Sequence, residues 1–269
     1  MICPPRHVLI TGASSGIGQA LAEIYAGPAI LLSLGGRDNT RLSAVAARCR
    51  SRGAEVSTAP VDVTDREAMA EWIGTRDAAR AVDLVIANAG ISLGSRPPAS
   101  GPPVTDPPAS GPDVDPDGQV RRIFDVNVTG VLNTIQPLIG PMRQRRAGQI
   151  AIMSSIAAFH GLPSAPAYSA SKAAVKAYGE ALRGDLQYDG IAVNVICPGY
   201  VESRITAANS FPMPFMMTAE RAAAIIRKRL ARNQARIVFP WQMLFAVRLL
   251  QALPAPLSGY LVRHLPRKN

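Results

Sequence analysis

Residues 7–18 read HVLITGASSGIG, the stretch that says most about how this chain folds. Its first five residues form an apolar run typical of a buried β-strand, and glycines follow at positions 12, 16 and 18. The next residues, QALAEIYA, favour a helix. Glycines between a strand and a helix let the backbone turn tightly and approach a pyrophosphate at the helix N-terminus. Alone, this signal is weak, because an ordinary strand-to-helix loop can have the same composition.

Six more apolar runs of strand length follow along the chain, and segments with helical periodicity separate most of them. The runs cover residues 29–34, 55–61, 83–88, 148–155, 191–197 and 235–239. Nearly continuous apolar strands that alternate with helices are typical of βαβ units. We therefore predict one α/β domain over residues 1–240, with a doubly wound, seven-stranded parallel sheet and helices on both faces. Residues 241–269 would form a basic, apolar helical extension.

The 269 residues carry a formal net charge of +10, and the excess is confined to one end. Residues 1–203 contain 18 Lys and Arg against 18 Asp and Glu, whereas residues 204–269 contain 11 against the single acid Glu220. Nucleic-acid binding is disfavoured, because the basic end has no recognised module and few aromatic residues for stacking. A neutral body with a basic, apolar end indicates a membrane surface or an acidic partner instead.

The cysteines and histidines indicate neither a disulfide framework nor a metal site. The three cysteines are odd in number and far apart, which favours a reducing compartment and hence the cytoplasm. None of the three histidines has the spacing of a metal ligand. The N-terminus resembles no signal peptide, and no uncharged apolar run approaches the ~20 residues that a membrane span needs.

Residues 94–118 interrupt the alternation of strands and helices. They are rich in proline, and PPASGP occurs twice, at 97–102 and 107–112. A segment rich in Pro, Gly and Ser holds neither helix nor strand, so we predict a loop insertion. Two interpretations stay open: a tolerated surface insertion, which the low cost of long loops favours, and a lid or docking segment.

The end of the second strand indicates which dinucleotide the chain prefers. A site for NAD usually places an acid there, against the ribose 2′-hydroxyl. Here the sequence reads Gly35-Gly36-Arg37-Asp38, with Gly36 near the expected position of the acid. Arg37 could pair with a 2′-phosphate, so NADP(H) is favoured over NAD(H). If Asp38 occupied the ribose position instead, the preference would weaken or reverse.

A candidate proton-transfer group lies further along the chain, in the segment YSASK at 168–172. Tyr168 and Lys172 are four residues apart and so project from one face of a helix. An ammonium beside a phenol stabilises the phenolate, which predicts a lowered pKa for Tyr168 and acid/base chemistry near neutral pH. Ser155 ends the strand at 148–155, where its hydroxyl would point into the same cleft.

Together, these motifs resemble those of the short-chain dehydrogenase/reductase family, whose members have a single-domain Rossmann fold. The glycine motif TGxxxGIG matches residues 11–18, the NAG motif matches 88–90 and the PG turn matches 198–199. The catalytic residues of the family match Asn127, Ser155, Tyr168 and Lys172. All occur in the expected order and at appropriate distances over residues 7–240.

The chain departs from the family pattern in two places. Asn88 and Asn127 are further apart than usual, because the PPASGP insertion lies between them. In addition, IANAG stands where NNAG is more usual, so Ala87 replaces a polar residue.

The resemblance implies an NAD(P)-dependent oxidoreductase that transfers a hydride between C4 of the nicotinamide and a carbonyl or alcohol carbon. Tyr168 would donate or remove the proton of the substrate oxygen, and Ser155 would hold that oxygen. Lys172 would lower the pKa of Tyr168 and bind the nicotinamide ribose. Asn127 would support a water that links Lys172 to solvent.

The resemblance also implies which residues bind the cofactor. Asp62 and Val63 match an adenine-contacting pair, while Val201 and Ser203 match contacts to the nicotinamide carboxamide, with Ser203 where Thr is usual. The complete expected set is Gly12, Ser14, Ser15, Gly16, Ile17, Gly18, Arg37, Asp62, Val63, Asn88, Ala89, Gly90, Tyr168, Lys172, Pro198, Gly199, Val201 and Ser203. Family members are commonly oligomers, so a homo-oligomer is expected.

The expected substrate is a ketone or secondary alcohol, and a hydrophobic one. The reason is the segment FPMPFMM at 211–217, whose Phe and Met side chains suit an irregular apolar ligand as a lid. A loop packed into the core fits this segment equally well. The alternative function is a catalytically idle NADP-binding regulatory or membrane-associated protein, which the intact Ser155, Tyr168 and Lys172 disfavour.

The C-terminal part of the chain follows a basic, helix-like stretch at 219–236. Residues 241–253 are apolar nearly all round, with Arg248 and Gln251 marking one polar stripe. With basic flanks and with Trp241 and Tyr260 near its ends, the segment 241–265 could lie at the surface of the cytoplasmic membrane. The equally weighted alternative is that its apolar face packs on the body or forms a dimer contact.

Overall fold

The computed structural model describes residues 4–92, 118–162, 165–207 and 212–254, together with Leu257 and Tyr260. Its centre is one sheet of parallel strands in the order β3-β2-β1-β4-β5-β6-β7. The strands are β1 (His7–Thr11), β2 (Leu31–Gly36), β3 (Glu55–Pro60), β4 (Leu84–Ala87), β5 (Gly148–Met153), β6 (Ile191–Pro198) and β7 (Arg236–Phe239). The predicted α/β fold with a seven-stranded parallel sheet is confirmed.

Helices connect the strands, and several begin where a side chain can cap them. The carboxylates of Asp38 and Asp65 accept hydrogen bonds from backbone N–H groups at the starts of α2 (Asn39–Arg50) and α3 (Arg66–Ala79), and the Thr218 hydroxyl does the same for α8 (Ala219–Leu230). The other helices are α1 (Gly16–Tyr25), α4 (Gln119–Phe124), α5 (Gly130–Arg145), α6 (Pro166–Leu186), α7 (Arg204–Ala207) and α9 (Trp241–Ala252). Short turns of other helical types are η1 (Asp125–Thr129), η2 (Ile156–Ala158) and η3 (Gln187–Asp189).

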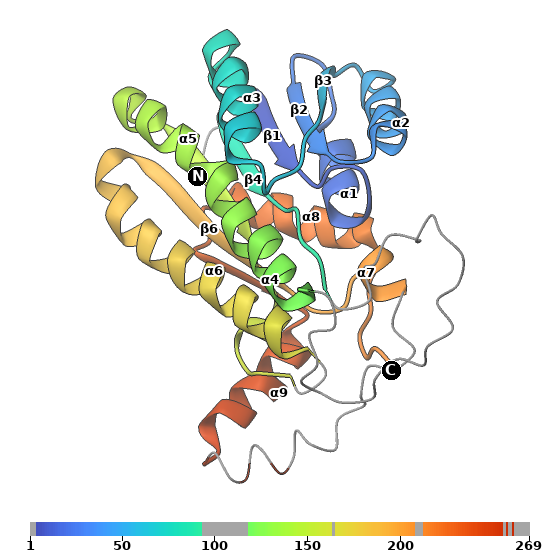
Figure 1. Ribbon diagram of the computed structural model, residues 1–269, viewed down its shortest axis with the longest axis vertical. Helices are drawn as coiled ribbons and strands as arrows, with labels where there is room; N and C mark the ends of the chain where they lie inside the picture. The colour runs from blue at the N-terminus through green and yellow to red at the C-terminus, as the bar shows by residue number, and fades with distance from the viewer. Residues whose placement is uncertain are drawn as a thin grey trace.

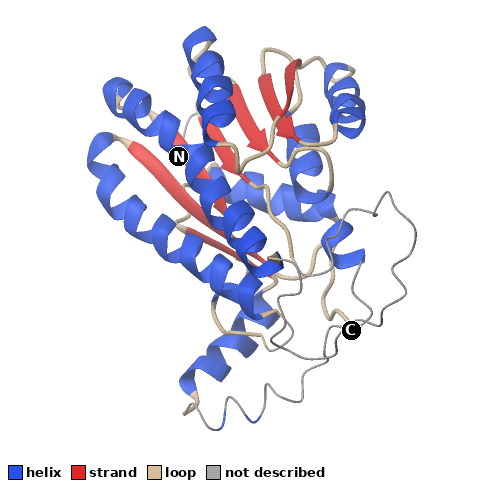
Figure 2. Cartoon of the chain, viewed as in Figure 1, coloured by secondary structure: helices blue, strands red, loops and turns tan. Residues whose placement is uncertain are grey.

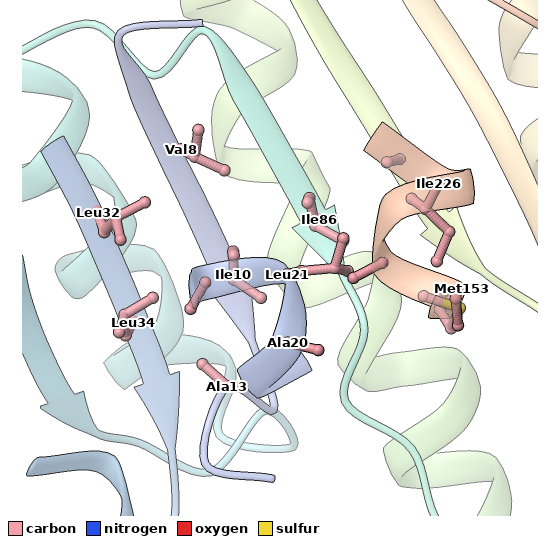
Figure 3. Packing of buried hydrophobic residues seen from close by; sticks show 14 of the residues in the cluster. Val8, Ile10, Ala13, Ala20, Leu21, Leu32, Leu34, Ile86, Met153 and Ile226 are labelled. Carbon is pink, nitrogen blue, oxygen red and sulfur yellow. The ribbon is translucent and has the colours of Figure 1, made fainter. Parts of the chain in front are cut away.

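The helices cover both faces of the sheet (Figure 2). Successive strand residues point to opposite faces, so each strand contributes to two cores. Val8 and Ile10 of β1 belong to the core beneath α1, α2 and α8, where Leu21 and Ile226 meet them (Figure 3). Leu9, between them, belongs to the core beneath α3, α5 and α6. Burial on both faces explains why the strands are apolar almost throughout.

The basic stretch at 219–236 does not form a single helix. α8 ends at Leu230, and Asn233, with a φ of 50°, lies in the turn that leads into β7. A residue in the left-handed conformation is a common way to end a helix. Arg236 lies in β7 and pairs with Glu180 of α6. The predicted helix is therefore too long at its C-terminal end.

One face of α9 packs on the body of the protein. Leu244 and Val247 contact the small cluster formed by Phe159, Val195 and Cys197. The side chain of Gln251 also donates a hydrogen bond to the carbonyl of Phe159, just after η2. α9 is therefore held against the same face of the sheet as α6.

The opposite face of α9 is exposed, and it carries Trp241, Phe245 and Leu249. Of the two alternatives for this segment, packing on the body thus describes one face of α9, and the other face is open to solvent. No helix in the described ranges is both long enough and apolar enough to cross a membrane.

Some of the segments predicted as loops lie outside the residues that the structure describes. These are residues 93–117, which contain the proline-rich repeats, and Phe211. Of the segment 212–217, Met217 is buried and forms a β-bridge with Val201, whereas Phe215 and Met216 are exposed. The segment therefore packs into the core at one end only.

Candidate active site

Two neighbouring strands end at the centre of the site. Thr11 ends β1, and Asn88 follows β4, the next strand in the sheet. The side-chain amide of Asn88 donates to the carbonyls of Thr11 at 3.0 Å and of Gly12 at 3.2 Å. The backbone N–H groups of Asn88 and Ala89 donate to the Thr11 hydroxyl at 3.2 and 3.4 Å. These bonds fix the NAG segment against the glycine-rich turn.

The glycine-rich turn leaves no room for side chains at two positions. A Cβ added to Gly18 would lie 2.3 Å from the carbonyl oxygen of Gly12 and 2.5 Å from Nδ2 of Asn88. Gly12 itself has a φ of 65°, and a Cβ there would lie 2.8 Å from Cα of Ala89. At these two positions the turn therefore packs directly against its own backbone and against the NAG segment, which only glycine allows.

The first turn of α1 opens beside this surface. Ser15 precedes the helix, but its side chain makes no capping hydrogen bond, and no acidic residue lies in the first turn. The backbone N–H groups of this turn keep their capacity to bind an anion. The side chain of Ile17 packs against the core and so holds the turn in place.

The segment after β6 lies against the glycine-rich turn. Pro198 ends β6, and Gly199 and the buried Val201 follow it. Ser203 reaches α1: a Cβ added to Gly16 would lie 3.2 Å from Cβ of Ser203. Two segments that the sequence assigned to cofactor binding, far apart along the chain, are thus brought together.

A basic side chain lies at the carboxyl end of β2. Gly36 faces the glycine-rich turn, because a Cβ added there would lie 3.5 Å from Oγ of Ser14. Arg37 follows it, and its exposed guanidinium is 4.0 Å from the carboxylate of Asp62. Arg37 and Asp62 are therefore loosely paired above the end of the sheet.

Asp38 is engaged in the structure of α2. Its carboxylate accepts a hydrogen bond from the backbone N–H of Arg41 at 2.9 Å and pairs with the Arg41 guanidinium at 2.8 Å. An N-cap carboxylate that is also paired is held at the helix start. The placement of Asp38 therefore disfavours the alternative in which it binds the ribose.

Val63 lies deeper than Asp62. Its side chain is buried, and its carbonyl accepts a hydrogen bond from Nδ2 of Asn133 at 2.9 Å. The Asp62 carboxylate stays near the surface and accepts hydrogen bonds from the backbone and hydroxyl of Thr64. The pair expected to contact adenine thus has one exposed and one buried member.

The predicted catalytic hydroxyls come from different elements and meet. Ser155 follows β5 and caps η2, where its Oγ accepts a hydrogen bond from the N–H of Ala157 at 3.1 Å. Tyr168 lies in the first turn of α6, a helix that starts at Pro166. The side chains of Ser155 and Tyr168 are joined by a hydrogen bond.

Lys172 is buried one helical turn after Tyr168. Its Nζ lies 5.8 Å from the centroid of the Tyr168 ring and donates to the carbonyl of Met153 at 2.9 Å. A Cβ added to Gly90 would lie 3.2 Å from both Lys172 Nζ and Asn127 Oδ1. The ammonium and the amide oxygen therefore both border the space that Gly90 leaves free.

Asn127 is buried in the π-helical turn η1 and links two parts of the site. Its Nδ2 donates to the carbonyl of Ile91 and to Oγ of Ser171, both at 3.0 Å, and its Oδ1 accepts from the N–H of Ile91 at 2.8 Å. These bonds tie the segment after β4 to α6. Single π-helical turns of this kind are frequent at functional sites.

Burial governs the ionisation of the two central groups. Desolvation raises the pKa of Tyr168, and the lowering effect of its hydrogen bond with Ser155 is smaller. Desolvation also lowers the pKa of Lys172 to about 8. The prediction that the pKa of Tyr168 falls is therefore wrong for this structure, because the loss of hydration outweighs the stabilisation of the phenolate.

Two serines that the sequence did not single out hold the catalytic helix in place. Ser154 donates to the carbonyl of Lys172 at 2.8 Å, and Ser171 donates to the carbonyl of Tyr168 at 2.8 Å. Each serine lies directly before a predicted catalytic residue, which was the only signal that could have identified it. In the described ranges, no group of His, Cys, Asp and Glu could hold a metal ion.

Comparison with known proteins identifies the family. The model of the family described as short chain dehydrogenase matches residues 6–212. An uncharacterized oxidoreductase of Myxococcus xanthus is 38% identical over 261 residues, which cover 97% of each chain. This chain therefore belongs to the short-chain dehydrogenase family, and it is an oxidoreductase with an NAD(P)-binding Rossmann fold.

Two solved structures share this fold. A short-chain dehydrogenase of Sphingobium yanoikuyae in complex with NADPH has a TM-score of 0.70 and 26% identity, covering 93% of this chain and 96% of that one. A short chain dehydrogenase/reductase of Burkholderia phymatum in complex with NAD has a TM-score of 0.75 and 25% identity, covering 91% and 92%. The same fold thus accommodates either cofactor.

Proposed function

We propose that this protein is an NADP(H)-preferring enzyme that interconverts a hydrophobic ketone and its secondary alcohol. One observation carries the proposal: Ser155, Tyr168, Lys172 and Asn127 converge beside Gly90 at the carboxyl ends of β4 and β5. A proton donor, a second hydroxyl and an ammonium are then gathered in one place. This is the set of groups that carbonyl reduction by hydride transfer requires.

The residues of the cleft fit a dinucleotide. The uncapped start of α1, with the glycine-rich turn held against the NAG segment beside it, would hold the pyrophosphate. Lys172 and Ser203 would hold the nicotinamide riboside at the other end of the cleft. A nicotinamide bound there supplies or accepts the hydride.

Tyr168 provides the proton during reduction. Its raised pKa keeps the phenol protonated at neutral pH, as a donor to the carbonyl oxygen must be. Ser155 accepts the N–H of Ala157 with one lone pair, so its hydroxyl proton can turn from Tyr168 to the same substrate oxygen when substrate binds. For the reverse oxidation, Tyr168 must first give its proton to Lys172, and the resulting phenolate then accepts the proton of the alcohol.

Lys172 and Asn127 return the proton to Tyr168. Oδ1 of Asn127 accepts one hydrogen bond from Ile91, and its second lone pair can hold a water beside Lys172 Nζ. A proton then moves from that water through Lys172 to the phenolate. With a pKa of about 8, Lys172 can both give and take a proton near neutral pH.

The preference for NADP(H) is based on the end of β2. Gly36 offers no carboxylate to a ribose 2′-hydroxyl, and Asp38 is held by α2. Arg37 is 53% exposed, and its pairing with Asp62 at 4.0 Å is loose enough to give way to a 2′-phosphate.

The preference for a hydrophobic substrate is based on the apolar side chains close to Ser155. Ile156 follows Ser155 directly, and its Cδ1, Cδ of Pro240 and Sδ of Met243 lie 3.5, 2.9 and 2.6 Å from the position of a Cβ on Gly199. The neighbourhood of Ser155 is therefore apolar on this side, which favours an apolar substrate over a polar one.

The test is the oxidation of NADPH with a panel of apolar ketones. Tyr168→Phe removes only the hydroxyl, so we expect kcat/KM to fall by at least about 100-fold while NADPH still binds. Tyr178→Phe is the matched control, because Tyr178 lies on the same helix and packs against the core. That variant should keep the rate of the wild type.

An unchanged rate in Tyr168→Phe would refute the role of Tyr168 as the acid. Wild-type protein that binds NADPH and turns over no ketone would support the catalytically idle alternative instead. Measuring NADPH binding by thermal shift in parallel separates these outcomes from a folding defect.

A further inference from the structure

The C-terminal part of the structure presents an apolar surface that the fold does not cover. Trp241, Phe245 and Leu249 follow one another at intervals of four residues and are 71%, 66% and 56% exposed. Phe215 and Met216, 54% and 46% exposed, lie beside Trp241, since all three line one pocket. These five side chains are called the apolar face below.

Basic side chains border the apolar face. Arg221 and Arg229 line the pocket that it forms, which has a volume of about 330 Å³. Arg248 lies on α9, three residues after Phe245 and hence beside it. Neither Arg221 nor Arg248 forms an ion pair within the part of the chain that the structure describes. The surface therefore has an apolar centre and a cationic margin.

We propose that the apolar face docks on an anionic lipid bilayer. Exposed Trp, Phe and Leu side chains enter the boundary between head groups and acyl chains, while arginines at the margin bind lipid phosphates. Residues 204–269 contain one acid against 11 Lys and Arg, so this end of the chain is attracted to anionic lipid as a whole. α9 has 12 residues, a length that suits a helix lying in the interface.

A second copy of the chain fits this surface less well. A two-fold contact would place the apolar face against itself and bring the cationic margin of one copy against the cationic margin of the other. Like charges at an interface disfavour association. An anionic bilayer supplies the opposite charge and adapts its shape to the exposed side chains.

Docking in this way would bring the substrate cleft to the bilayer. Met243 of α9 lies against Gly199, and Gln251 is bonded to the carbonyl of Phe159, next to the turn that follows Ser155. In Figure 1, α9 lies at the end of the molecule where α4 and the start of α6 are found. Delivery of an apolar ketone from the bilayer rests on the proposed function, whereas docking itself does not.

The test measures binding of the full chain to lipid vesicles by co-sedimentation. Vesicles of phosphatidylglycerol and phosphatidylcholine in equal parts are compared with vesicles of phosphatidylcholine alone. The chain has two tryptophans, and Trp72 is only 9% exposed, so a blue shift in fluorescence reports the burial of Trp241. We expect binding and a blue shift with the anionic vesicles only, and a loss of both at high salt.

Point variants connect the binding to the apolar face. The double variant Phe245→Ser/Leu249→Ser should weaken binding to the anionic vesicles by at least about tenfold. Leu244 and Val247, which attach α9 to the body, are left intact, so the fold is kept. Tyr188→Ser is the matched control: Tyr188 lies in η3, is 77% exposed and should be dispensable for binding.

Three results would overturn the proposal. The first is equal sedimentation with the two kinds of vesicle, or none with either; the second is unchanged binding by the double variant. The third is a wild type that does not bind vesicles and is a dimer in analytical ultracentrifugation, together with a double variant that is a monomer. That result would assign the apolar face to a contact between two copies of the chain. None of these measurements depends on catalysis, so failure of the docking and failure of the ketone reduction are distinguishable.

Discussion

The cleft around Gly90 and the surface around α9 use polar and apolar groups in opposite ways. In the cleft, Asn127 makes three hydrogen bonds while fully buried, and the backbone comes too close at Gly18 for any side chain. On α9, Trp241 and Phe245 project into solvent. The hydrogen bonds and close packing in the cleft hold its groups in fixed positions, which suits a ligand of one defined shape. The exposed side chains of α9 instead suit a partner that can adapt its shape. Substitutions in the two regions should therefore differ sharply in their effects.

The largest effect is expected from Gly18→Ala. The added methyl group would meet the Gly12 carbonyl oxygen at 2.3 Å and Asn88 Nδ2 at 2.5 Å, and both are held by hydrogen bonds. We expect about 3 kcal/mol lower stability to urea and loss of the thermal shift with NADPH. Gly74→Ala is the control, because Gly74 is exposed in α3 with no atom within 4 Å of an added Cβ.

The control variant should gain about 0.5 to 1 kcal/mol, since alanine favours a helix more than glycine does. If Gly18→Ala bound NADPH as the wild type does, tight packing at Gly18 would not be needed for cofactor binding, and the contrast with the C-terminal region would weaken.

An effect of intermediate size on stability is expected when a change in pH alters the charge of Lys172. Its pKa of about 8 in the folded protein lies below the usual 10.5, because the buried ammonium is poorly hydrated. The unfolded chain therefore binds more protons between these two values, so stability rises with pH across this window. Relative to Lys172→Met, the wild type should gain at most about 3 kcal/mol as the pH rises from about 8 to 10.5.

Urea unfolding of the wild type and Lys172→Met at several pH values measures this gain. Below pH 8 both the folded and unfolded wild type carry the charge, so the difference between the two proteins should be constant there. A difference that stays constant up to pH 10.5 would show that the ammonium is not desolvated.

The smallest effect is expected from Arg37→Ser. Loss of the guanidinium should reduce the preference for NADPH over NADH by about tenfold in Kd, because a charge-assisted bond to the 2′-phosphate is removed. Arg48→Ser is the control: Arg48 is a similarly exposed arginine on α2 that pairs with Glu23. A wild type that prefers NADH would instead assign the ribose contact to Asp38.

The fold could be predicted from the sequence because strands buried on both faces are apolar throughout. The runs at 7–11 and 191–197 lie within one residue of β1 and β6. The run at 29–34 begins two residues before β2, because Ala29 adopts a φ of 65° in the turn that precedes the strand. Local composition does not report such a turn.

The site could be predicted as a set of residues, but its electrostatics could not. The spacing of Tyr168 and Lys172 correctly placed both on α6, yet the raised pKa of Tyr168 comes from surroundings that only the folded chain provides. The network of Asn127 with Ser171 depends on the π-helical turn η1, for which the sequence carries no pattern. Likewise, the apolar composition of 241–253 does not show which face of α9 packs on the body.

The contact of Gly16 with Ser203 has a consequence for the synthesis of the chain. Gly16 and Ser203 are far apart in the sequence, and α8 must also arrive to cover Leu21 and the rest of α1. Contacts between such distant residues form late, after most of the chain has left the ribosome. Until then the apolar side of α1 stays uncovered by α8.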